Sequence, residues 1–112
     1  MKTLIIIRPD AVTRGLVGEI ITRFERHSIR LAGLKIQHLN KDFAEKLYGL
    51  HKGKPFYDRL ITNMTSNPSV LVVLDTDVLD RESAISLVRR IIGDTDPAKA
   101  EMGTIRGDFG LR

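Results

Sequence analysis

The sequence predicts a single α+β domain over residues 1–112, in which helices pack on a sheet as a two-layer sandwich. Two apolar runs, at residues 3–7 and 70–74, are typical of buried strands. Apolar side chains recur at helical spacing in four other segments. A composition of 42% hydrophobic and 29% charged residues fits one globular core rather than a disordered chain.

The elements of the first half follow from these patterns. The β-branched run at residues 3–7 ends at Arg8 and Pro9, which predicts a central strand buried on both faces and then a turn. Apolar positions between residues 16 and 24 share one side of an amphipathic helix. Residues 34–38 alternate between apolar and polar side chains, as a half-exposed strand does.

The second half repeats the alternation of helices and strands. Asn40 is a suitable N-cap for a helix with apolar residues at positions 43, 47 and 50, and a short helix is expected around residues 56–64. The apolar strand at residues 70–74 follows. Asp80 is the expected N-cap of a helix that Gly93 ends, and the remaining tail is expected to be a loop. A ferredoxin-like layout needs one strand more than these patterns provide.

Charge and composition limit the partners. Eighteen Lys and Arg against fourteen Asp and Glu give a net charge of +4, which favours nucleotides or nucleic acid as partners. Only 5% of the residues are aromatic and there is no Trp, so nucleic acid is the weaker interpretation. The absence of Cys excludes disulfides and Cys-ligated metals. With no apolar run long enough to span a bilayer and no signal peptide, we expect a cytoplasmic protein without a membrane partner.

Three arginines lie where predicted elements end: Arg8, Arg89 and Arg106. A guanidinium offers a planar set of donors that fits phosphate oxygens, so several of them could hold a polyphosphate. Alternatively, Arg89 only interacts with the dipole of its helix, and Arg8 is only solvated. The glycines at positions 103 and 107 allow close approach of a ligand to the backbone.

The aromatic and histidine residues give weaker signals. Phe56, Leu60 and Tyr48 fit a core, although an exposed pair of Phe56 and Leu60 could also contact a nucleobase. Three histidines have no acid or hydroxyl at a spacing that predicts a general base, and we interpret them as surface or structural residues. They are His27, His38 and His51.

The chain resembles the nucleoside diphosphate kinase family from residue 3 to residue 109. The segments that carry the resemblance are residues 7–12, 14–21, 54–56 and 92–97 and, above all, Gly103-Thr104-Ile105-Arg106-Gly107-Asp108-Phe109. The resemblance implies a ferredoxin-like core with an antiparallel sheet and assembly into homo-oligomers, either hexamers or tetramers. It also implies transfer of the γ-phosphate of ATP or another nucleoside triphosphate to a nucleoside diphosphate through a phosphohistidine, with Mg²⁺ on the phosphates.

The resemblance also implies roles for individual residues. Arg8, Arg89, Thr95 and Arg106 match the positions that contact phosphates, although the family has Lys at the position of Arg8. Phe56 and Leu60 match the pair that contacts the base, and Tyr48 matches a supporting tyrosine.

The family's catalytic histidine lies in an Asn-x-x-His segment that follows Arg-Gly-Asp-Phe, and the sequence ends at Arg112 without it. The fourth strand and the C-terminal helix are missing with it. We therefore expect the chain to be inactive in phosphoryl transfer, and the alternative function is a non-catalytic module for nucleotide binding or oligomer formation.

Overall fold

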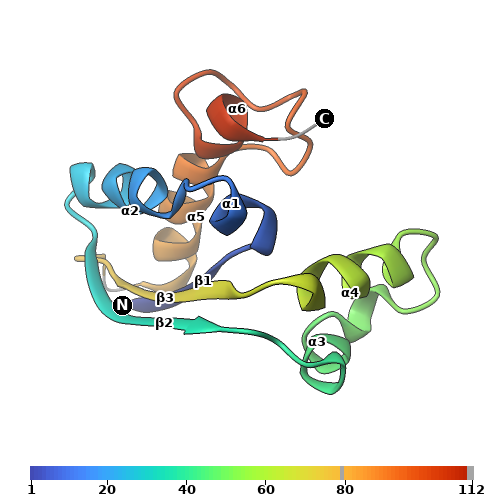
Figure 1. Cartoon of the computed structure of the whole chain (residues 1–112). Coiled ribbons are helices and arrows are strands. Elements are labelled where there is room, and N and C mark those ends of the chain that lie inside the picture. Colours follow the sequence, from blue (N-terminus) through green and yellow to red (C-terminus); the bar gives the residue numbers. More distant parts are fainter. Residues whose placement is uncertain (79, 111–112) are drawn as a thin grey trace. The chain divides into compact units, whose positions relative to one another are not determined.

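A computed structural model describes residues 1–78 and 80–110 of the chain (Figure 1). The order of elements is strand, helices, strand, helices, strand, helices, as an α+β domain requires. The strands are β1 (Lys2–Ile7), β2 (Arg30–Gln37) and β3 (Ser69–Asp75). The helices are α1 (Pro9–Thr13), α2 (Val17–Arg26), α3 (Lys41–Leu47), the 3-10 helix η1 (Gly49–His51), α4 (Tyr57–Ser66), α5 (Arg81–Ile92) and α6 (Ile105–Phe109).

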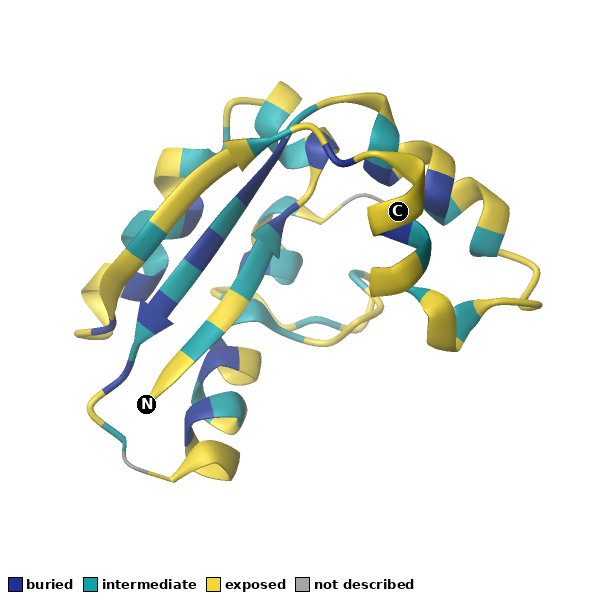
Figure 2. Cartoon of the chain, turned by 90° about the horizontal axis from the view of Figure 1, so that it is seen from below, coloured by how far each residue is buried: buried dark blue, intermediate teal, exposed yellow. Residues whose placement is uncertain are grey.

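The three strands form one antiparallel sheet in the order β1-β3-β2, so β3 is its central strand. Figure 2 shows β3 mainly in the colours of buried and intermediate residues, whereas β2 is mainly exposed. The prediction that residues 3–7 form a central strand is wrong, because β1 lies at an edge and Leu4 is 55% exposed. An apolar run indicates a strand but does not show whether that strand has one or two neighbours in the sheet. The edge position of β1 could therefore not be predicted from its sequence.

The chain divides into two compact units, and each strand contributes to both. The first unit comprises residues 1–3, 18–32 and 73–112, and the second comprises residues 4–17 and 33–72. The first unit therefore contains α5, α6 and all of α2 except Val17. The second contains α1, α3, η1 and α4.

The first unit has a core built from amphipathic helices. Phe24 of α2 and Ala84 of α5 are fully buried, which confirms the apolar faces predicted from their spacing. The Asp80 carboxylate accepts hydrogen bonds from the backbone N–H groups of residues 82 and 83 and caps α5 as predicted. Gly93 ends this helix with a φ of 96°, a conformation that favours glycine.

The tail after Gly93 is not only a loop, as the sequence predicted, because it contains α6, which contacts α5. The Thr104 side chain accepts a hydrogen bond from the Gly107 N–H at 3.0 Å and caps this short helix. Five residues of helix produce too little periodicity to be recognised in a sequence.

In the second unit, α1 and α3 each contact α4. The Asn40 side chain caps α3 by accepting a hydrogen bond from the Phe43 N–H at 2.8 Å, as predicted. Residues 8–10, predicted as a turn, instead lead into α1, with the buried Pro9 as its first residue. Proline is well suited to that position, because its fixed φ is helical and its missing N–H would have no partner there.

Candidate functional site

The first unit contains an open groove of about 1250 Å³, which we call the α5–α6 groove. It is lined by residues along α5 from its first to its last turn, by the loop that follows and by the beginning of α6. Four of its side chains are basic and three are acidic. The lining residues are Glu82, Ile85, Ser86, Arg89, Arg90, Ile92, Gly93, Asp94, Thr95, Lys99, Glu101, Thr104 and Arg106. Arg89, Thr95 and Arg106, which the resemblance assigns to phosphates, therefore share one concave surface.

Arg89 enters the groove from the last turn of α5 and is exposed to solvent. Its backbone carbonyl accepts a hydrogen bond from the Gly93 N–H at 2.9 Å, which closes the end of the helix. The guanidinium is thus near the negative end of the helix dipole and also lines the groove. Both interpretations of Arg89 are compatible with this position.

Thr95 lies in the loop between α5 and α6, where two aspartates shape the backbone. Asp94 accepts a hydrogen bond from the Asp96 N–H at 2.9 Å, and Asp96 accepts one from the Ala98 N–H at 3.0 Å. Such Asx turns fix a loop without the help of a helix or a strand. The exposed Thr95 is therefore presented to the groove by a defined backbone.

Arg106 comes from α6, and its side chain reaches back toward the end of α5. Its Nη1 atom donates a hydrogen bond to the Gly93 carbonyl at 3.2 Å. A Cβ atom at Gly93 would lie only 2.5 Å from Thr104 Oγ1, so the absence of a side chain there permits this close packing. The sequence suggested that Gly107 admits a ligand, but the space beside it is filled by the backbone of Glu101.

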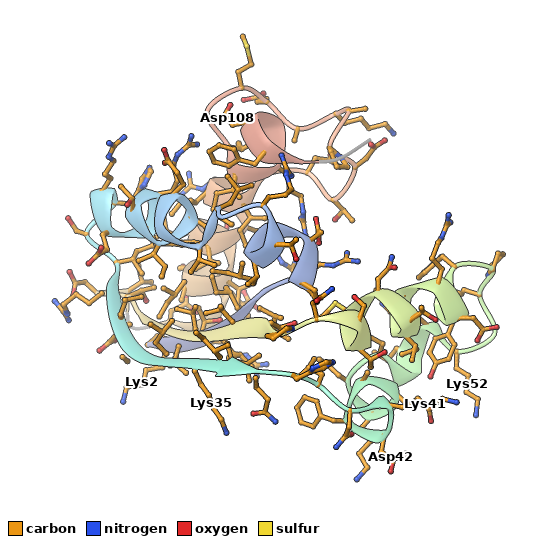
Figure 3. All side chains as sticks on the ribbon, viewed as in Figure 1. Lys2, Lys35, Lys41, Asp42, Lys52 and Asp108 are labelled. Atoms are coloured by element: carbon orange, nitrogen blue, oxygen red, sulfur yellow. The ribbon has the colours of Figure 1, made fainter. Side chains whose placement is uncertain are left out.

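Arg23 and Asp108 form an ion pair beside α6 that the sequence did not reveal. Arg23 Nη1 lies 2.7 Å from Asp108 Oδ2, and the Asp108 carboxylate also accepts a hydrogen bond from the Gly103 N–H at 3.0 Å. Figure 3 labels Asp108 at α6. These bonds, the one from Gly103 first, lower the pKa of Asp108. In the sequence Arg23 is only one charge on the polar side of a helix, so no local pattern indicates its partner.

The second unit holds the other four predicted site residues: Arg8, Tyr48, Phe56 and Leu60. Tyr48, His51 and Phe56 form a row of rings that we call the aromatic cluster. The His51 ring lies 6.5 Å from Tyr48 and 5.5 Å from Phe56, centroid to centroid. Phe56 is 41% exposed, so it is a surface residue rather than a core residue.

Tyr48 and Phe56 have charged neighbours in this unit. Burial raises the pKa of the Tyr48 hydroxyl, and the positive charge of Arg8 partly opposes this effect. The hydroxyl therefore stays protonated at neutral pH and keeps its hydrogen-bond donor. The ammonium of Lys54 lies 5.9 Å from the centre of the Phe56 ring, so a cation is present beside the aromatic cluster.

The imidazole rings of two histidines are held by backbone carbonyls. His27 Nδ1 lies 2.7 Å from the carbonyl oxygen of Arg23, and His38 Nε2 lies 2.6 Å from that of Thr65. His51 belongs to the aromatic cluster, with its Nδ1 atom 3.5 Å from the Lys54 ammonium. These contacts agree with the structural role that the sequence suggested for the histidines.

A family model described as nucleoside diphosphate kinase matches residues 1–112. The chain belongs to the nucleoside diphosphate kinase family. A nucleoside diphosphate kinase from Saccharolobus islandicus (strain L.S.2.15 / Lassen #1) is 46% identical over 110 residues, which are 98% of this chain and 76% of that protein. One from Staphylothermus marinus is 49% identical over the same length, with 98% and 74% covered.

A solved structure supports membership in the nucleoside diphosphate kinase family through the fold. It is that of a halophilic nucleoside diphosphate kinase from Halobacterium salinarum in complex with CDP. The TM-score is 0.90 at 36% identity, and the match covers 98% of this chain and 69% of the other. The predicted ferredoxin-like α+β class is thereby confirmed.

Among residues 1–78 and 80–110, no group of three or more His, Cys, Asp or Glu side chains could hold a metal ion. In the same part of the chain, no helix combines the length and the apolar character that crossing a membrane requires.

Proposed function

We propose that this member of the nucleoside diphosphate kinase family binds nucleoside di- and triphosphates through the α5–α6 groove. The observation that carries the proposal is that Arg89, Thr95 and Arg106 line one groove, as the resemblance assigns them to phosphates. Two guanidinium groups and a hydroxyl are donors that suit phosphate oxygens at any physiological pH. Each charge-assisted contact is worth roughly 1.5–3 kcal/mol.

We assign contact with the base to Phe56 and Leu60 and a supporting role to Tyr48. The exposed ring of Phe56 offers an apolar face, and the Leu60 N–H donates a hydrogen bond to the Phe56 carbonyl at 2.9 Å, which fixes the start of α4. Apolar contact does not read the hydrogen-bonding pattern of a base, so all common bases are expected to bind. Arg8, whose charge acts on Tyr48, is the fourth proposed phosphate contact.

Mg²⁺ enters this proposal as part of the nucleotide substrate. The groove has both basic and acidic side chains, and the described residues form no cluster able to hold the ion by themselves. The ion would neutralise phosphate charge during transfer, while Arg89 and Arg106 hold the phosphate oxygens.

The covalent carrier of the phosphate is proposed to be a histidine in an Asn-x-x-His segment, as the resemblance implies. Arginine and Mg²⁺ stabilise charge but do not form the covalent intermediate. His27 and His38 have a ring nitrogen bound to a backbone carbonyl, and none of the three histidines lines the groove. A polypeptide of these 112 residues is therefore expected to bind nucleotides without transferring phosphate.

Incubation with γ-labelled ATP and Mg²⁺ tests this expectation. The 112-residue polypeptide should gain no acid-labile phosphate and convert no GDP to GTP above background. A polypeptide extended by the Asn-x-x-His segment of a relative should do both. Label on His51 or another histidine of the 112 residues would show that the assignment of the carrier is wrong.

Assembly and location are proposed on the same family basis. Leu34 and Ile36 of β2 are 55% and 70% exposed, and apolar side chains at this density on one strand favour cover by another copy of the chain. We therefore propose a homo-oligomer, a hexamer or a tetramer, working in the cytoplasm, where nucleoside triphosphates are abundant. Sedimentation of the protein would reveal a monomer if this is wrong.

A further inference from the structure

The ion pair between Arg23 and Asp108 is more strongly fixed than an ordinary surface pair. Besides the 2.7 Å contact with Asp108, Arg23 Nη1 donates a hydrogen bond to the Gly103 carbonyl at 3.0 Å. The guanidinium carbon also lies 4.8 Å from the centre of the Phe109 ring. Only 20% of the Arg23 side chain and 27% of the Asp108 side chain are exposed. These contacts hold the guanidinium in one place.

The pair fixes both polar groups of one residue. The Gly103 carbonyl accepts from Arg23, and the Gly103 N–H donates to Asp108 at 3.0 Å. Gly103 has a φ of 93°, so the chain turns sharply there just before α6. These bonds therefore connect the turn at Gly103 to the end of α6. We call the set of Arg23, Asp108 and Gly103 the Arg23 brace.

Arg106 lies within the segment that the Arg23 brace closes. Residues two apart in a helix are rotated by about 200°, so Arg106 and Asp108 lie on opposite sides of α6. On one side Arg106 donates to the Gly93 carbonyl at 3.2 Å, and on the other Asp108 binds Arg23. The short helix is thus held from both sides.

A helix of five residues does not keep its position by itself. Isolated helices shorter than about 12 residues are marginal in water, so α6 depends on contacts outside its own backbone. Contacts with phosphate depend on the position of the guanidinium. A group that is not already in place loses conformational entropy when the ligand binds, and this loss weakens the affinity.

We propose that Arg23 and Asp108 are positioning residues that hold α6 so that Arg106 meets the nucleotide phosphates. The inference rests on the proposed function, since it takes Arg106 as a phosphate contact. Arg23 itself does not line the α5–α6 groove and acts through Arg106.

The same unit offers a matched control pair. Arg30 Nη2 lies 3.3 Å from Asp77 Oδ1, with side chains 66% and 71% exposed. Exposed pairs of this kind contribute about 0–1 kcal/mol, so removing this one should lower the stability by at most that amount and leave nucleotide binding unchanged.

A double-mutant cycle on ADP binding, measured by calorimetry, tests the proposal. Arg106→Ala should weaken ADP binding about ten- to 100-fold, because it removes a charge-assisted contact. Arg23→Met should weaken it about threefold to tenfold in the wild-type background, as coupled residues of one hydrogen-bond network do. In the Arg106→Ala background, Arg23→Met should cost less than about twofold, and Arg30→Met should have no effect in either background.

The outcomes separate the two proposals. If Arg106→Ala leaves ADP binding unchanged, the proposed phosphate contact is wrong. If Arg106→Ala weakens binding but Arg23→Met does not, or costs the same in both backgrounds, the positioning role is wrong. Circular dichroism checks the fold of each variant, and Arg23→Lys or Asp108→Asn takes the place of Arg23→Met in the cycle if that variant does not fold.

Discussion

The α5–α6 groove and the aromatic cluster are held in different ways. Around the groove, side chains bond to the backbone: Thr104 caps α6, Asp94 shapes the loop, and Arg106 reaches the Gly93 carbonyl. The aromatic cluster instead consists of ring contacts at 5.5 and 6.5 Å, between the exposed Phe56 and the half-buried His51 and Tyr48. Directional bonds fix the positions of donors, whereas ring contacts tolerate shifts. The difference would suit the roles proposed above, in which donors of the groove meet phosphate oxygens and apolar faces contact a base of any kind.

Arg89 is expected to have one of the largest effects on nucleotide binding. Arg89→Met should weaken ADP binding about ten- to 100-fold, since it removes a charge-assisted contact, and should lower the stability by at most about 1 kcal/mol through the helix dipole. Calorimetry and thermal unfolding measure the two effects. Arg81→Met, at the first residue of the same helix, is the control. A loss of stability with unchanged ADP binding would show that Arg89 interacts only with the helix dipole and does not contact phosphate.

The packing beside the groove is tested by a pair of glycines. Gly93 and Gly15 both have positive φ, but only at Gly93 would a Cβ meet neighbouring atoms, with Thr104 Oγ1 at 2.5 Å. Gly93→Ala should therefore destabilise the protein by about 2–4 kcal/mol, and Gly15→Ala by about 1 kcal/mol. Urea unfolding gives both values. Equal losses would mean that backbone strain alone, and not the close packing, requires Gly93.

A smaller effect is expected in the aromatic cluster. Phe56→Ala should weaken the binding of ADP, GDP and CDP by a similar factor of about three, because it removes only apolar contact. Phe43→Ala is the matched control, since Phe43 is 44% exposed, close to the 41% of Phe56, and lies in the same unit. A loss confined to one nucleotide would show that Phe56 selects a base.

The smallest expected effect is a dependence of the protein's stability on pH. Hydrogen bonds from Gly103 and Arg23 lower the pKa of Asp108, so its ionised form is favoured in the folded state. This contribution to stability is fully present above the unfolded pKa of about 3.9 and is lost as the pH falls through the folded pKa. Thermal unfolding between pH 6 and pH 3 should therefore change less in Asp108→Asn than in the wild type. Identical pH profiles would contradict the assignment.

The sequence predicts best those features that depend on a few adjacent residues. Asn40, Asp80 and Gly93 are local signals for the ends of helices, and each acts as expected. The Arg23 brace escaped prediction because its two charged residues are 85 positions apart and neither has an unusual neighbourhood in the sequence. The edge position of β1 depends on strand pairing, which an apolar run does not encode.

The phosphate contacts proposed for Arg89 and Arg106 rest on the resemblance to the family, since the residues alone left interaction with the helix dipole as an equal alternative for Arg89. The structure adds that both line one groove, although it holds them on different helices. The end of α5 at Gly93 can be expected from the sequence, but neither α6 nor its approach to α5 across the loop at residues 93–104 can.

Recognition of phosphates by the α5–α6 groove is tested most directly by calorimetry with two series of ligands. ADP, AMP and adenosine differ in the number of phosphates, and ADP, GDP and CDP differ in the base. If donors of the α5–α6 groove carry the affinity, binding should weaken about tenfold or more with each phosphate removed, and the three diphosphates should agree within a factor of ten. Adenosine bound as tightly as ADP would contradict the claim that this groove recognises phosphates. A preference above tenfold for one base would contradict the claim that the protein does not discriminate between bases.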